Sequence, residues 1–344
     1  MSAAEQNRTE FPSLREDTAE DKALRPARLQ EFVGQPVLKD RLSVSIQAAL
    51  KRKEPLDHVL LSGPPGLGKT TLASIVAAEM GGRLHATSAP ALAKPGDLAR
   101  VLTLLEETDV LFIDEIHRLS RACEEILYPA MEDGFIDLIV GEGMGAQSVK
   151  LPLKPFTLVG ATTRSGSLSA PLKSRFGIDL KLEFYEIEDL TRIVIRSAAL
   201  LQIGMTSAAA ALIAERSRMT PRAANRLLRR IRDYATVDSV SEIEPEFAAR
   251  SLMSLGVDTL GLTEMDRKLL TLVIERYGGG PVGIKTLASL VDEEEQTLEE
   301  DHEPFMLRLG LMEKTPQGRM ATEKAASHLG LSFVKKNEIQ QTLF

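Results

Sequence analysis

The segment GPPGLGKTT at residues 63–71 has the residue types and spacing of a phosphate-binding loop. Its glycines let the backbone wrap closely, so that N–H groups face a phosphate chain, while Lys69 can reach the β- and γ-phosphates and the Thr70 hydroxyl can bind Mg²⁺. The apolar run at 58–62 leads into the loop, and the helical spacing of 71–80 places a helix N-terminus at the same anion. This strand–loop–helix context favours nucleoside triphosphate binding over an ordinary Gly-rich turn.

An acidic pair that could act on the bound triphosphate follows a second apolar run. In DVLFIDEIHR (109–118), four apolar residues precede Asp114 and Glu115, and open parallel sheets bind ligands at the carboxyl ends of their strands. Hydrolysis requires a carboxylate for the metal and a base for water. We therefore predict that Asp114 holds Mg²⁺ through water and that Glu115 orients or deprotonates the attacking water. The alternative is an acidic pair that caps the next helix.

A third apolar run, FTLVGATTR at 156–164, ends in polar residues. Thr163 could position water or sense the γ-phosphate beside the acidic pair, or it could simply end a strand, and the residues alone leave both open. Arg175 and Arg222 are candidates for the positive charge at the γ-phosphate. Arg164 is close to Arg175 in the sequence and is an alternative to Arg175 in that role. Arg226, Arg229 and Arg230 are expected on a solvated face.

Composition limits the classes of protein. The 344 residues predict two or three domains, and 43% hydrophobic with 26% charged residues are typical of a soluble globular chain. The single Cys123 excludes an internal disulfide framework, and five scattered histidines argue against a zinc cluster. Without an apolar run that could span a bilayer or a signal core, we expect a cytoplasmic protein with no membrane contact. A net charge of −7 means that nucleic acid would need a local basic patch.

Apolar runs and helical patterns divide the chain into segments. We expect residues 1–22 to be a flexible tail and 23–185 to be an α/β domain, a parallel sheet with helices on both faces. Two alternating apolar stretches around GEGMG predict a β-hairpin inserted at 134–153. Residues 186–260 are rich in Ala, Leu and Arg and predict a small all-α domain. Residues 261–344 have three helical patterns and then a short hairpin candidate, which indicates a winged-helix domain.

The ordered motifs of the chain resemble those of AAA+ ATPases. GPPGLGKTT, DEIHR, GATTR, PLKSRFG and TPRAANRLLRR match the two nucleotide motifs, the first sensor, the arginine finger and the second sensor. Further segments are similar to the bacterial RuvB family, motors that drive branch migration of Holliday junctions: LRPARLQEFVGQ, KPGDLA, MEDGFIDLIVGEG, GGGPVG and HLGL. The resemblance extends from about Leu24 to about Leu331. It implies an AAA+ P-loop domain, a helical lid domain and a winged-helix DNA-binding domain.

The resemblance also implies a role for each matching position. Thr163 falls at the first sensor. Arg175 is the arginine finger that reaches the ATP of a neighbouring subunit, which implies a six-membered homo-oligomeric ring, and Glu132, Asp133 and Gly134 lie near that shared interface. ATP and Mg²⁺ are assigned to Leu24, Arg25, Gly66, Lys69, Thr70, Thr71, Asp114, Glu115, Tyr185 and Arg222.

Macromolecular partners follow from the same resemblance. The family moves the double-stranded DNA arms of Holliday junctions in recombination and repair, together with RuvA, which recognises the junction, and with RuvC in the resolving complex. The apolar tip of the inserted hairpin, Leu138, Ile139 and Val140, would dock RuvA. On residues alone such a hairpin is more often purely structural, and only the resemblance favours docking.

The C-terminal domain has few cations to offer to DNA. Residues 261–344 contain ten Lys and Arg against fourteen Asp and Glu, and eight of these acids lie within 292–303, which we interpret as a solvated face that DNA avoids. Candidate phosphate contacts are Lys314 and Arg319 in KTPQGR. Related sequences usually have arginine in place of Lys314 and Gln317, so we predict fewer phosphate contacts and a shallower salt dependence here.

Two other functions are compatible with parts of the pattern. A protein-remodelling AAA+ machine would use an aromatic pore loop, yet the chain has no Trp, four Tyr and no aromatic–Gly loop between its nucleotide motifs. A nucleotide-gated winged-helix regulator would not need the complete catalytic set.

One further departure from the family is Met219, which replaces a common Gly before Thr220. It leaves Arg222 in place but bears on the geometry of the preceding turn.

Overall fold

The computed structural model describes residues 23–140 and 147–333. The chain divides into two compact units. The first comprises the residues up to Gly63 together with Leu67–Glu183, and the second comprises Pro64–Gly66 together with the chain from Phe184 onward. The predicted tail at 1–22 lies outside the described residues.

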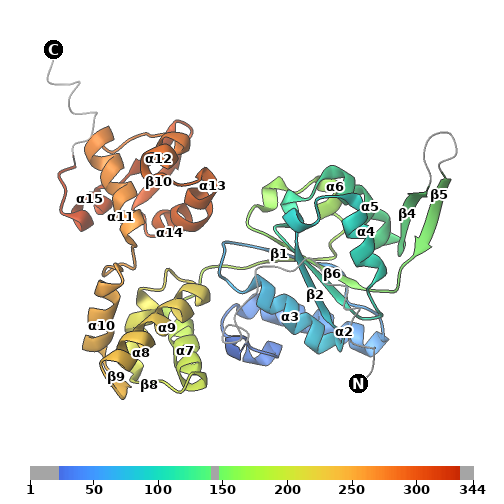
Figure 1. The fold of residues 1–344 in the computed structure, drawn as a ribbon, viewed down its shortest axis with the longest axis horizontal. Coiled ribbons are helices and arrows are strands. Elements are labelled where there is room, and N and C mark those ends of the chain that lie inside the picture. The colour runs from blue at the N-terminus through green and yellow to red at the C-terminus, as the bar shows by residue number, and fades with distance from the viewer. Residues whose placement is uncertain (1–22, 141–146, 334–344) are drawn as a thin grey trace, which may run out of the picture. The chain divides into compact units, whose positions relative to one another are not determined.

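A five-stranded parallel sheet forms the centre of the first unit (Figure 1). Its strands lie in the order β2-β3-β6-β1-β7. Every residue of β1 and β6 is buried, and so are the first four of β3, because helices cover both faces of the sheet. The three predicted strands are confirmed. Two others were not predicted, and the strand bounds are β1 Val59–Ser62, β2 Leu84–Ser88, β3 Val110–Asp114, β6 Thr157–Thr162 and β7 Ile178–Lys181.

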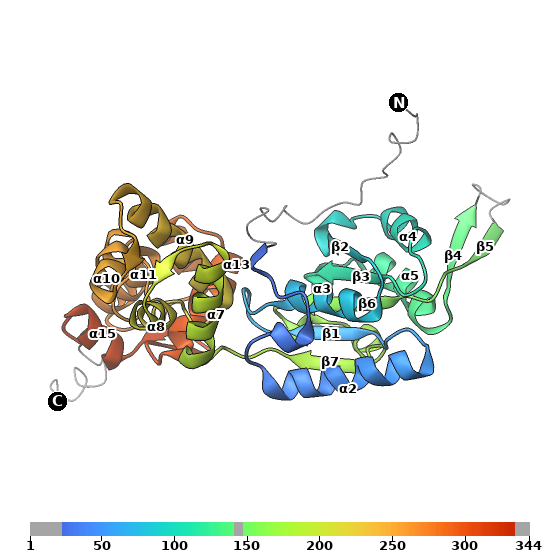
Figure 2. The same ribbon diagram turned by 90° about the horizontal axis from the view of Figure 1, so that it is seen from below.

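Helices lie on both faces of this sheet, as predicted. Figures 1 and 2 show α2 and α3 over one face and α4, α5 and α6 over the other. Buried side chains of α4, α5 and α6 join those of β3 and β6 in one apolar core. The helices of the first unit are η1 Leu29–Glu31, α2 Pro36–Arg52, α3 Lys69–Met80, η2 Ala89–Ala91, α4 Pro95–Thr103, η3 Ile116–Arg118, α5 Arg121–Glu132, η5 Ser165–Ser167 and α6 Ala170–Lys173.

The inserted hairpin is confirmed. Strand β4 (Phe135–Val140) pairs in antiparallel register with β5 (Gln147–Pro152), and Figure 1 shows the pair extending away from the central sheet. The three proposed RuvA contacts are the last three residues of β4, so they end a strand and do not form the connecting turn. That turn, residues 141–146, lies outside the described residues.

The second unit begins with the predicted helical domain. Its helices start at polar caps: the Thr206 hydroxyl accepts from the Ala209 N–H, and the Thr220 hydroxyl accepts from the Ala223 N–H before a Pro at the first helical position. A short parallel pair of strands closes one end of the domain. Its elements are α7 Ile187–Leu200, β8 Gly204–Met205, α8 Ser207–Glu215, α9 Pro221–Val237, β9 Glu242–Ile243 and α10 Pro245–Ser254.

A winged-helix domain follows and confirms the predicted order of three helical segments and a hairpin. One helix after the hairpin, α15, was not predicted, although Thr322 caps its start and Gly330 ends it in the left-handed conformation. The elements are α11 Glu264–Thr271, η6 Leu272–Arg276, α12 Ile284–Val291, α13 Glu295–Thr297, η7 Leu298–His302, α14 Glu303–Arg308, β10 Met312–Thr315, β11 Gly318–Ala321 and α15 Glu323–Leu329.

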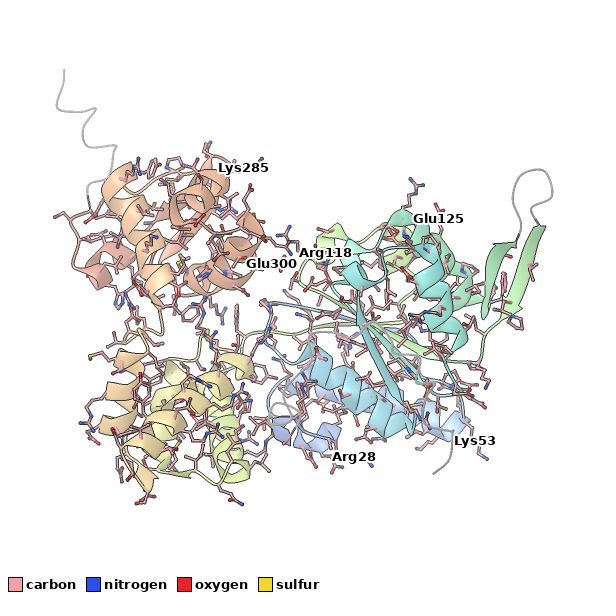
Figure 3. The ribbon with its side chains drawn as sticks, viewed as in Figure 1. Arg28, Lys53, Arg118, Glu125, Lys285 and Glu300 are labelled. Carbon is pink, nitrogen blue, oxygen red and sulfur yellow. The ribbon has the colours of Figure 1, made fainter. Side chains whose placement is uncertain are left out.

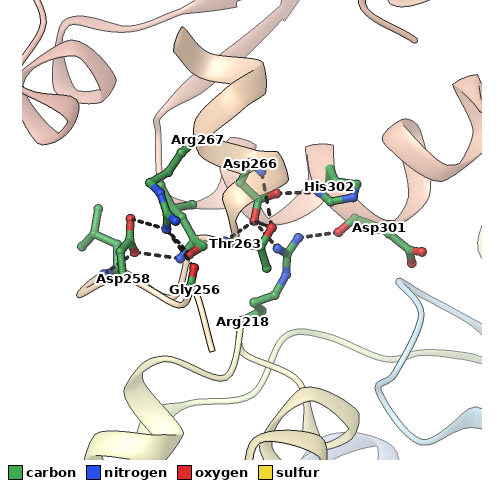
Figure 4. Close-up of polar contacts among 10 residues, drawn as sticks. Arg218, Gly256, Asp258, Thr263, Asp266, Arg267, Asp301 and His302 are labelled. Atoms are coloured by element: carbon green, nitrogen blue, oxygen red, sulfur yellow. Dashed lines mark hydrogen bonds and ion pairs between the residues drawn. The ribbon is translucent and has the colours of Figure 1, made fainter. Parts of the chain in front are cut away.

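A polar junction joins the lid and winged-helix domains within this unit (Figure 4). The Arg218 guanidinium donates to the Asp266 carboxylate and to the Asp301 carbonyl, and it lies over the Phe305 ring. His302 Nδ1 is 2.6 Å from Asp266 Oδ1. Burial alone would raise the pKa of Asp266, but the His302 hydrogen bond and the Arg218 charge outweigh burial and lower that pKa.

The turn before α9 has a backbone conformation that favours glycine, although this chain has Arg218 and Met219 there. Arg218 and Met219 both have left-handed backbone conformations, with φ of 54° and 56°. Glycine adopts this region at no steric cost, whereas a side chain strains it. In this chain the turn holds its shape through other contacts, among them a hydrogen bond from the Tyr185 N–H to the Met219 carbonyl and the ion pair of Arg218.

Candidate functional site: a phosphate loop, an acidic pair and two arginines

The loop between β1 and α3 has the backbone of a phosphate cradle. Gly63, Gly66 and Gly68 all have positive φ, at 144°, 80° and 103°. A Cβ on Gly63 would lie 2.6 Å from the Leu182 carbonyl oxygen, and one on Gly68 would meet the Phe32 ring at 3.3 Å. The loop therefore requires glycine at these positions, and it leads directly into the N-terminus of α3, where backbone N–H groups favour an anion.

Lys69 is the first residue of α3 and is 7% exposed. Its Nζ donates to the Gly63 carbonyl at 2.8 Å, so the ammonium group lies over the loop and not in solvent. Thr70 and Thr71 complete the first turn of the helix. This donor set fits a triphosphate: glycine-permitted backbone, one buried ammonium and two hydroxyls at a helix N-terminus.

The strand order brings the acidic pair to the same edge of the sheet. β6 lies between β1 and β3, so the loop after β1 and the acids after β3 are separated by one strand. Asp114 is the last residue of β3, and its Oδ1 accepts from the Glu115 N–H at 3.0 Å. Glu115 has a left-handed backbone with φ of 50°, which turns the chain away from the strand. The Gly63 N–H donates to the Thr162 carbonyl at 3.1 Å and links the loop to β6.

Glu115 belongs to a hydrogen-bonded cluster at the ends of β3 and β6. The Thr163 hydroxyl donates to Glu115 Oε2 at 3.1 Å, and His117 Nδ1 lies 3.2 Å from the same oxygen. His117 Nδ1 is also 2.9 Å from the Thr162 hydroxyl, which accepts from the Arg164 N–H at 2.9 Å. The structure thus places Thr163 against Glu115. No role was predicted for His117 from the sequence. Its place in DEIHR, two residues after Glu115, is the feature that could have indicated one.

The side chains that could bind a magnesium ion at this site offer oxygen ligands. Among the described residues, no three His, Cys, Asp or Glu side chains converge as a metal-binding group. Mg²⁺ commonly binds through one or two protein oxygens and takes its remaining ligands from water and substrate phosphates. The Thr70 hydroxyl in the first turn of α3 and the Asp114 carboxylate at the sheet edge are of this type.

Arg175 lies just beyond α6 and contacts α5. Its Nη1 donates to the Pro171 carbonyl at 2.6 Å, and its Nη2 donates to the Glu132 carboxylate at 3.1 Å. Asp133 and Gly134 follow Glu132 at the end of α5, where Gly134 turns the chain with φ of 67°. The structure therefore brings Arg175 into contact with Glu132, the first of the three residues predicted to lie near the same interface.

The segment before the sheet packs on the phosphate-loop helix. Leu24 is buried, and the chain from Arg25 runs into η1. The Arg28 guanidinium, labelled in Figure 3, donates to the Ala78 carbonyl near the end of α3, and the Leu29 N–H donates to Glu79. The structure thus holds the segment predicted to contact the nucleotide against α3.

The two predicted contacts of the lid lie in the second unit. Tyr185 is 4% exposed, and burial, followed by the Asp189 charge, raises the pKa of its phenol. Arg222 is exposed in the first turn of α9. Its N–H donates to the Gly66 carbonyl at 3.3 Å, and a Cβ on Gly66 would lie 3.0 Å from the Arg222 Cβ. The start of α9 therefore packs closely on this glycine.

The wing corrects one interpretation made from the sequence. Arg319 is 7% exposed, and its Nε and Nη2 donate to Glu303 Oε1 and Glu299 Oε1 at 2.5 and 2.8 Å. The acidic run at 292–303 is therefore not uniformly a solvated face, because two of its carboxylates neutralise this arginine. Lys314 Nζ lies 3.7 Å from both of these glutamates, but 54% of its side chain is exposed. Of the two predicted wing contacts, only Lys314 can reach a phosphate without breaking a buried ion pair.

The fold and the site define an AAA+ P-loop ATPase class of protein, with a phosphate loop, an acidic pair, a helical lid and a winged-helix domain. Family models match nearly all of the described chain: the RuvB Holliday junction DNA helicase P-loop domain at residues 24–182, the RuvB AAA lid domain at 185–258 and the RuvB C-terminal winged-helix domain at 259–330. The chain belongs to the RuvB family. Among the described residues, none of the helices combines the length and apolar character needed to cross a bilayer.

Solved structures agree with this assignment. The chain is similar to Thermotoga maritima RuvB, titled a Holliday junction branch migration motor, at 49% sequence identity, with a TM-score of 0.83 over 91% of this chain and 100% of that one. Two point mutants of the same Thermotoga protein are 50% identical to this chain, with TM-scores of 0.85 and 0.84, and cover 90% of it.

Proposed function

We propose that the protein is an ATP-driven DNA motor that drives branch migration of Holliday junctions, as a hexameric ring acting with RuvA. The observation that supports hydrolysis best is the arrangement on three adjacent strands. The phosphate loop follows β1, Thr163 follows β6, and Asp114 with Glu115 follow β3. A site that only binds nucleotide would not need a carboxylate held by a threonine and a histidine at this edge.

Each side chain has a distinct task in this proposal. The loop and Lys69 bind the phosphates, and Thr70 and Asp114 would hold Mg²⁺, which would neutralise part of the triphosphate charge. Glu115 orients the attacking water and accepts its proton. Thr163 donates to Glu115 and thereby keeps one carboxylate oxygen directed. The contacts of Leu24, Arg25, Tyr185 and Arg222 with the nucleotide are proposed from the family resemblance.

Arg175 is proposed to act on the ATP of the neighbouring subunit. Its guanidinium lies beside Glu132 at the end of α5, on a surface that the resemblance assigns to the shared interface. Stabilisation of the transferring phosphoryl group by an arginine from another subunit makes the site complete only in a ring. Double-stranded DNA, RuvA at the β4–β5 hairpin and RuvC in the resolving complex are the proposed partners.

Branch migration of synthetic junctions tests the proposal. Purified protein with RuvA, Mg²⁺ and ATP is expected to convert a labelled four-way junction to duplex products. Glu115→Gln is expected to bind ATP and RuvA but to leave the junction unmoved, because water is no longer activated. A wild-type protein that hydrolyses ATP in response to unfolded peptides, and that leaves junctions intact, would instead indicate a protein remodeller.

A further inference from the structure

Arg175 can act on a neighbour only if its guanidinium is presented in a defined place. Arginine has many rotamers, and ordering it costs side-chain entropy. The residue follows α6, a helix of only four residues, so its own backbone element offers little rigidity. Other groups must therefore define the position of the side chain.

Tyr128 on α5 provides a flat surface for this side chain. The Arg175 Cζ lies 4.4 Å from the centroid of the Tyr128 ring, a cation–π distance. The ring is itself fixed, because its hydroxyl donates to Glu124 Oε2 at 2.9 Å and the Ser169 hydroxyl donates to the same oxygen at 2.7 Å. Ser169 caps α6, and Glu124 is 8% exposed. A buried carboxylate thus fastens the Tyr128 ring to the start of the helix that leads to Arg175.

The edges of the guanidinium are not equivalent. Nη1 is bonded to the Pro171 carbonyl of its own turn, and Nη2 is bonded to Glu132, whose side chain is 55% exposed. Nε is buried and has no hydrogen-bond partner among the described residues. The ring contact and the Pro171 bond are internal, whereas Glu132 is a solvent-accessible anion that an incoming phosphate can replace.

We propose that Tyr128 is a positioning residue for Arg175, holding its guanidinium in place while the exposed Glu132 carboxylate gives way to the phosphate of a neighbouring subunit. The inference rests on the proposed action of Arg175 in trans. The aromatic face is what matters, because a cation–π contact persists when other hydrogen-bond partners change. The Tyr128 hydroxyl acts one step further away, by fixing the ring through Glu124.

Mixed rings distinguish this role from a general structural one. Tyr128→Leu rings are expected to hydrolyse ATP about tenfold more slowly than wild type, the loss that a desolvated cation–π contact of moderate strength would cause. Their affinity for a non-hydrolysable ATP analogue is expected to remain within twofold, roughly the reproducibility of a binding titration, because the phosphate loop is untouched. Tyr128→Phe keeps the aromatic face and is the matched control, with a loss of about threefold or less.

The decisive measurement is turnover after mixing with Lys69→Ala subunits, which have an intact Arg175 and Tyr128 but a disabled phosphate loop. Turnover per Tyr128→Leu subunit is expected to rise, since some of its ATP now faces an unaltered neighbour. If turnover per Tyr128→Leu subunit stays low in every mixture, the defect lies within the subunit itself and the inference is wrong. Tyr128→Met is a second non-aromatic variant, used if Tyr128→Leu does not fold.

The Arg175→Ala variant distinguishes the positioning role of Tyr128 from the proposed action of Arg175 on the neighbouring subunit. If Arg175→Ala rings hydrolyse ATP normally, the action of Arg175 in trans fails, and the role of Tyr128 fails with it. If Arg175→Ala rings are inactive but folded Tyr128→Leu rings match wild type, only the positioning role of Tyr128 is overturned.

Discussion

Arg175 near the sheet and Arg319 in the wing were both predicted from the sequence to contact anions, and the structure surrounds them differently. Arg175 lies on an aromatic face, pairs with one exposed carboxylate and has a buried Nε without a partner among the described residues. Arg319 is enclosed by Glu303 and Glu299 and forms three hydrogen bonds with them. One guanidinium retains capacity to bind another anion, and the other is saturated.

The difference shows that an arginine in a motif does not by itself indicate a ligand contact. Burial alone would lower the pKa of Arg319, but its hydrogen bonds and charge interactions with Glu303 and Glu299 outweigh burial and raise that pKa. Removing one partner of such a buried pair leaves the other as an uncompensated charge, which is strongly destabilising. The count and exposure of the carboxylates around an arginine therefore distinguish a structural role from a functional one.

The largest expected effect is on catalysis at Arg175. Arg175→Ala is expected to lower ATP turnover by about 10³-fold, because an arginine supplied in trans stabilises the charge of the transferring phosphoryl group. The unfolding free energy should fall by about 1–3 kcal/mol, since the variant loses the Tyr128 contact and the Pro171 hydrogen bond as well as an exposed ion pair. Steady-state turnover and urea unfolding measure the two quantities.

Arg164→Ala is the matched control, because Arg164 is the other candidate for this role. Mixed rings of Arg175→Ala and Lys69→Ala subunits are expected to recover part of the turnover. A complete absence of recovery, or a larger loss in Arg164→Ala than in Arg175→Ala, would transfer the role away from Arg175.

Arg319 is expected to show the opposite pattern. Arg319→Ala should destabilise the winged-helix domain by about 3–5 kcal/mol, since it leaves the buried Glu303 with only the 3.7 Å contact of the exposed Lys314 as an ion pair. ATP turnover per folded molecule without DNA should stay close to wild type. Urea unfolding monitored by circular dichroism measures the loss.

A double variant sharpens the interpretation of that loss. Arg319→Met with Glu303→Leu removes both buried charges and fills their volume with apolar atoms, and it should recover most of the lost stability. Recovery combined with full DNA binding would confirm that Arg319 is structural. A stable double variant that no longer binds DNA would instead indicate that Arg319 contacts DNA.

Two groups, His58 in the first unit and Asp266 in the second, are expected to respond to acid in different pH ranges. Burial is the main cause that lowers the pKa of His58 in the first unit, whose Nδ1 accepts from the Leu158 N–H. Unfolded histidine protonates near pH 6.5, so below that pH the unfolded state binds more protons and the unfolding free energy falls. Asp266 in the second unit has a lowered pKa, so its contribution is present above about pH 4 and is lost as the pH falls further.

Urea titrations between pH 5 and pH 7 test this difference. His58→Gln can retain the bond from Leu158 without titrating, and it should flatten the pH dependence of the first unfolding transition. An unchanged slope in this variant would assign the acid sensitivity to other groups.

The smallest expected effect is at Lys314. Lys314→Gln should change stability by less than about 1 kcal/mol, because its two ion pairs are long and its side chain is half exposed. If Lys314 binds a DNA phosphate, the slope of log affinity against log salt should become shallower by about one. Lys285 on α12, exposed and labelled in Figure 3, provides the matched control. A slope change in Lys285→Gln alone would place the DNA contact on α12.

Much of the first unit could be predicted from the sequence, because its signals are local. Continuous apolar runs gave the three central strands, and the glycines and Lys69 gave the loop between a strand and a helix. The edge strands β2 and β7 were missed, because their partly exposed residues resemble loops or alternate in polarity. Thr163 and Glu115 were predicted to be neighbours from the common sheet edge, and the structure joins them by a hydrogen bond.

Contacts between distant segments could not be predicted. Nothing in KTPQGR indicates that Arg319 lies against Glu303, which is sixteen residues earlier in the sequence. The pairing of Tyr128 with Arg175 and of Arg218 with Asp266 likewise depends on how helices pack. Sequence pattern identifies the residue types that can bind an anion, but tertiary packing decides which of them is already neutralised.

The junction at Asp266 has a mechanical consequence. This carboxylate caps α11 of the winged-helix domain and pairs with Arg218 of the lid, so one buried group belongs to both domains. Pivoting between them would break the Arg218–Asp266 ion pair, although Asp266 would keep its contacts with Thr263 and His302. Because Arg218 also donates to the Asp301 carbonyl, we expect a tilt of the lid to be transmitted to the winged-helix domain through this one side chain.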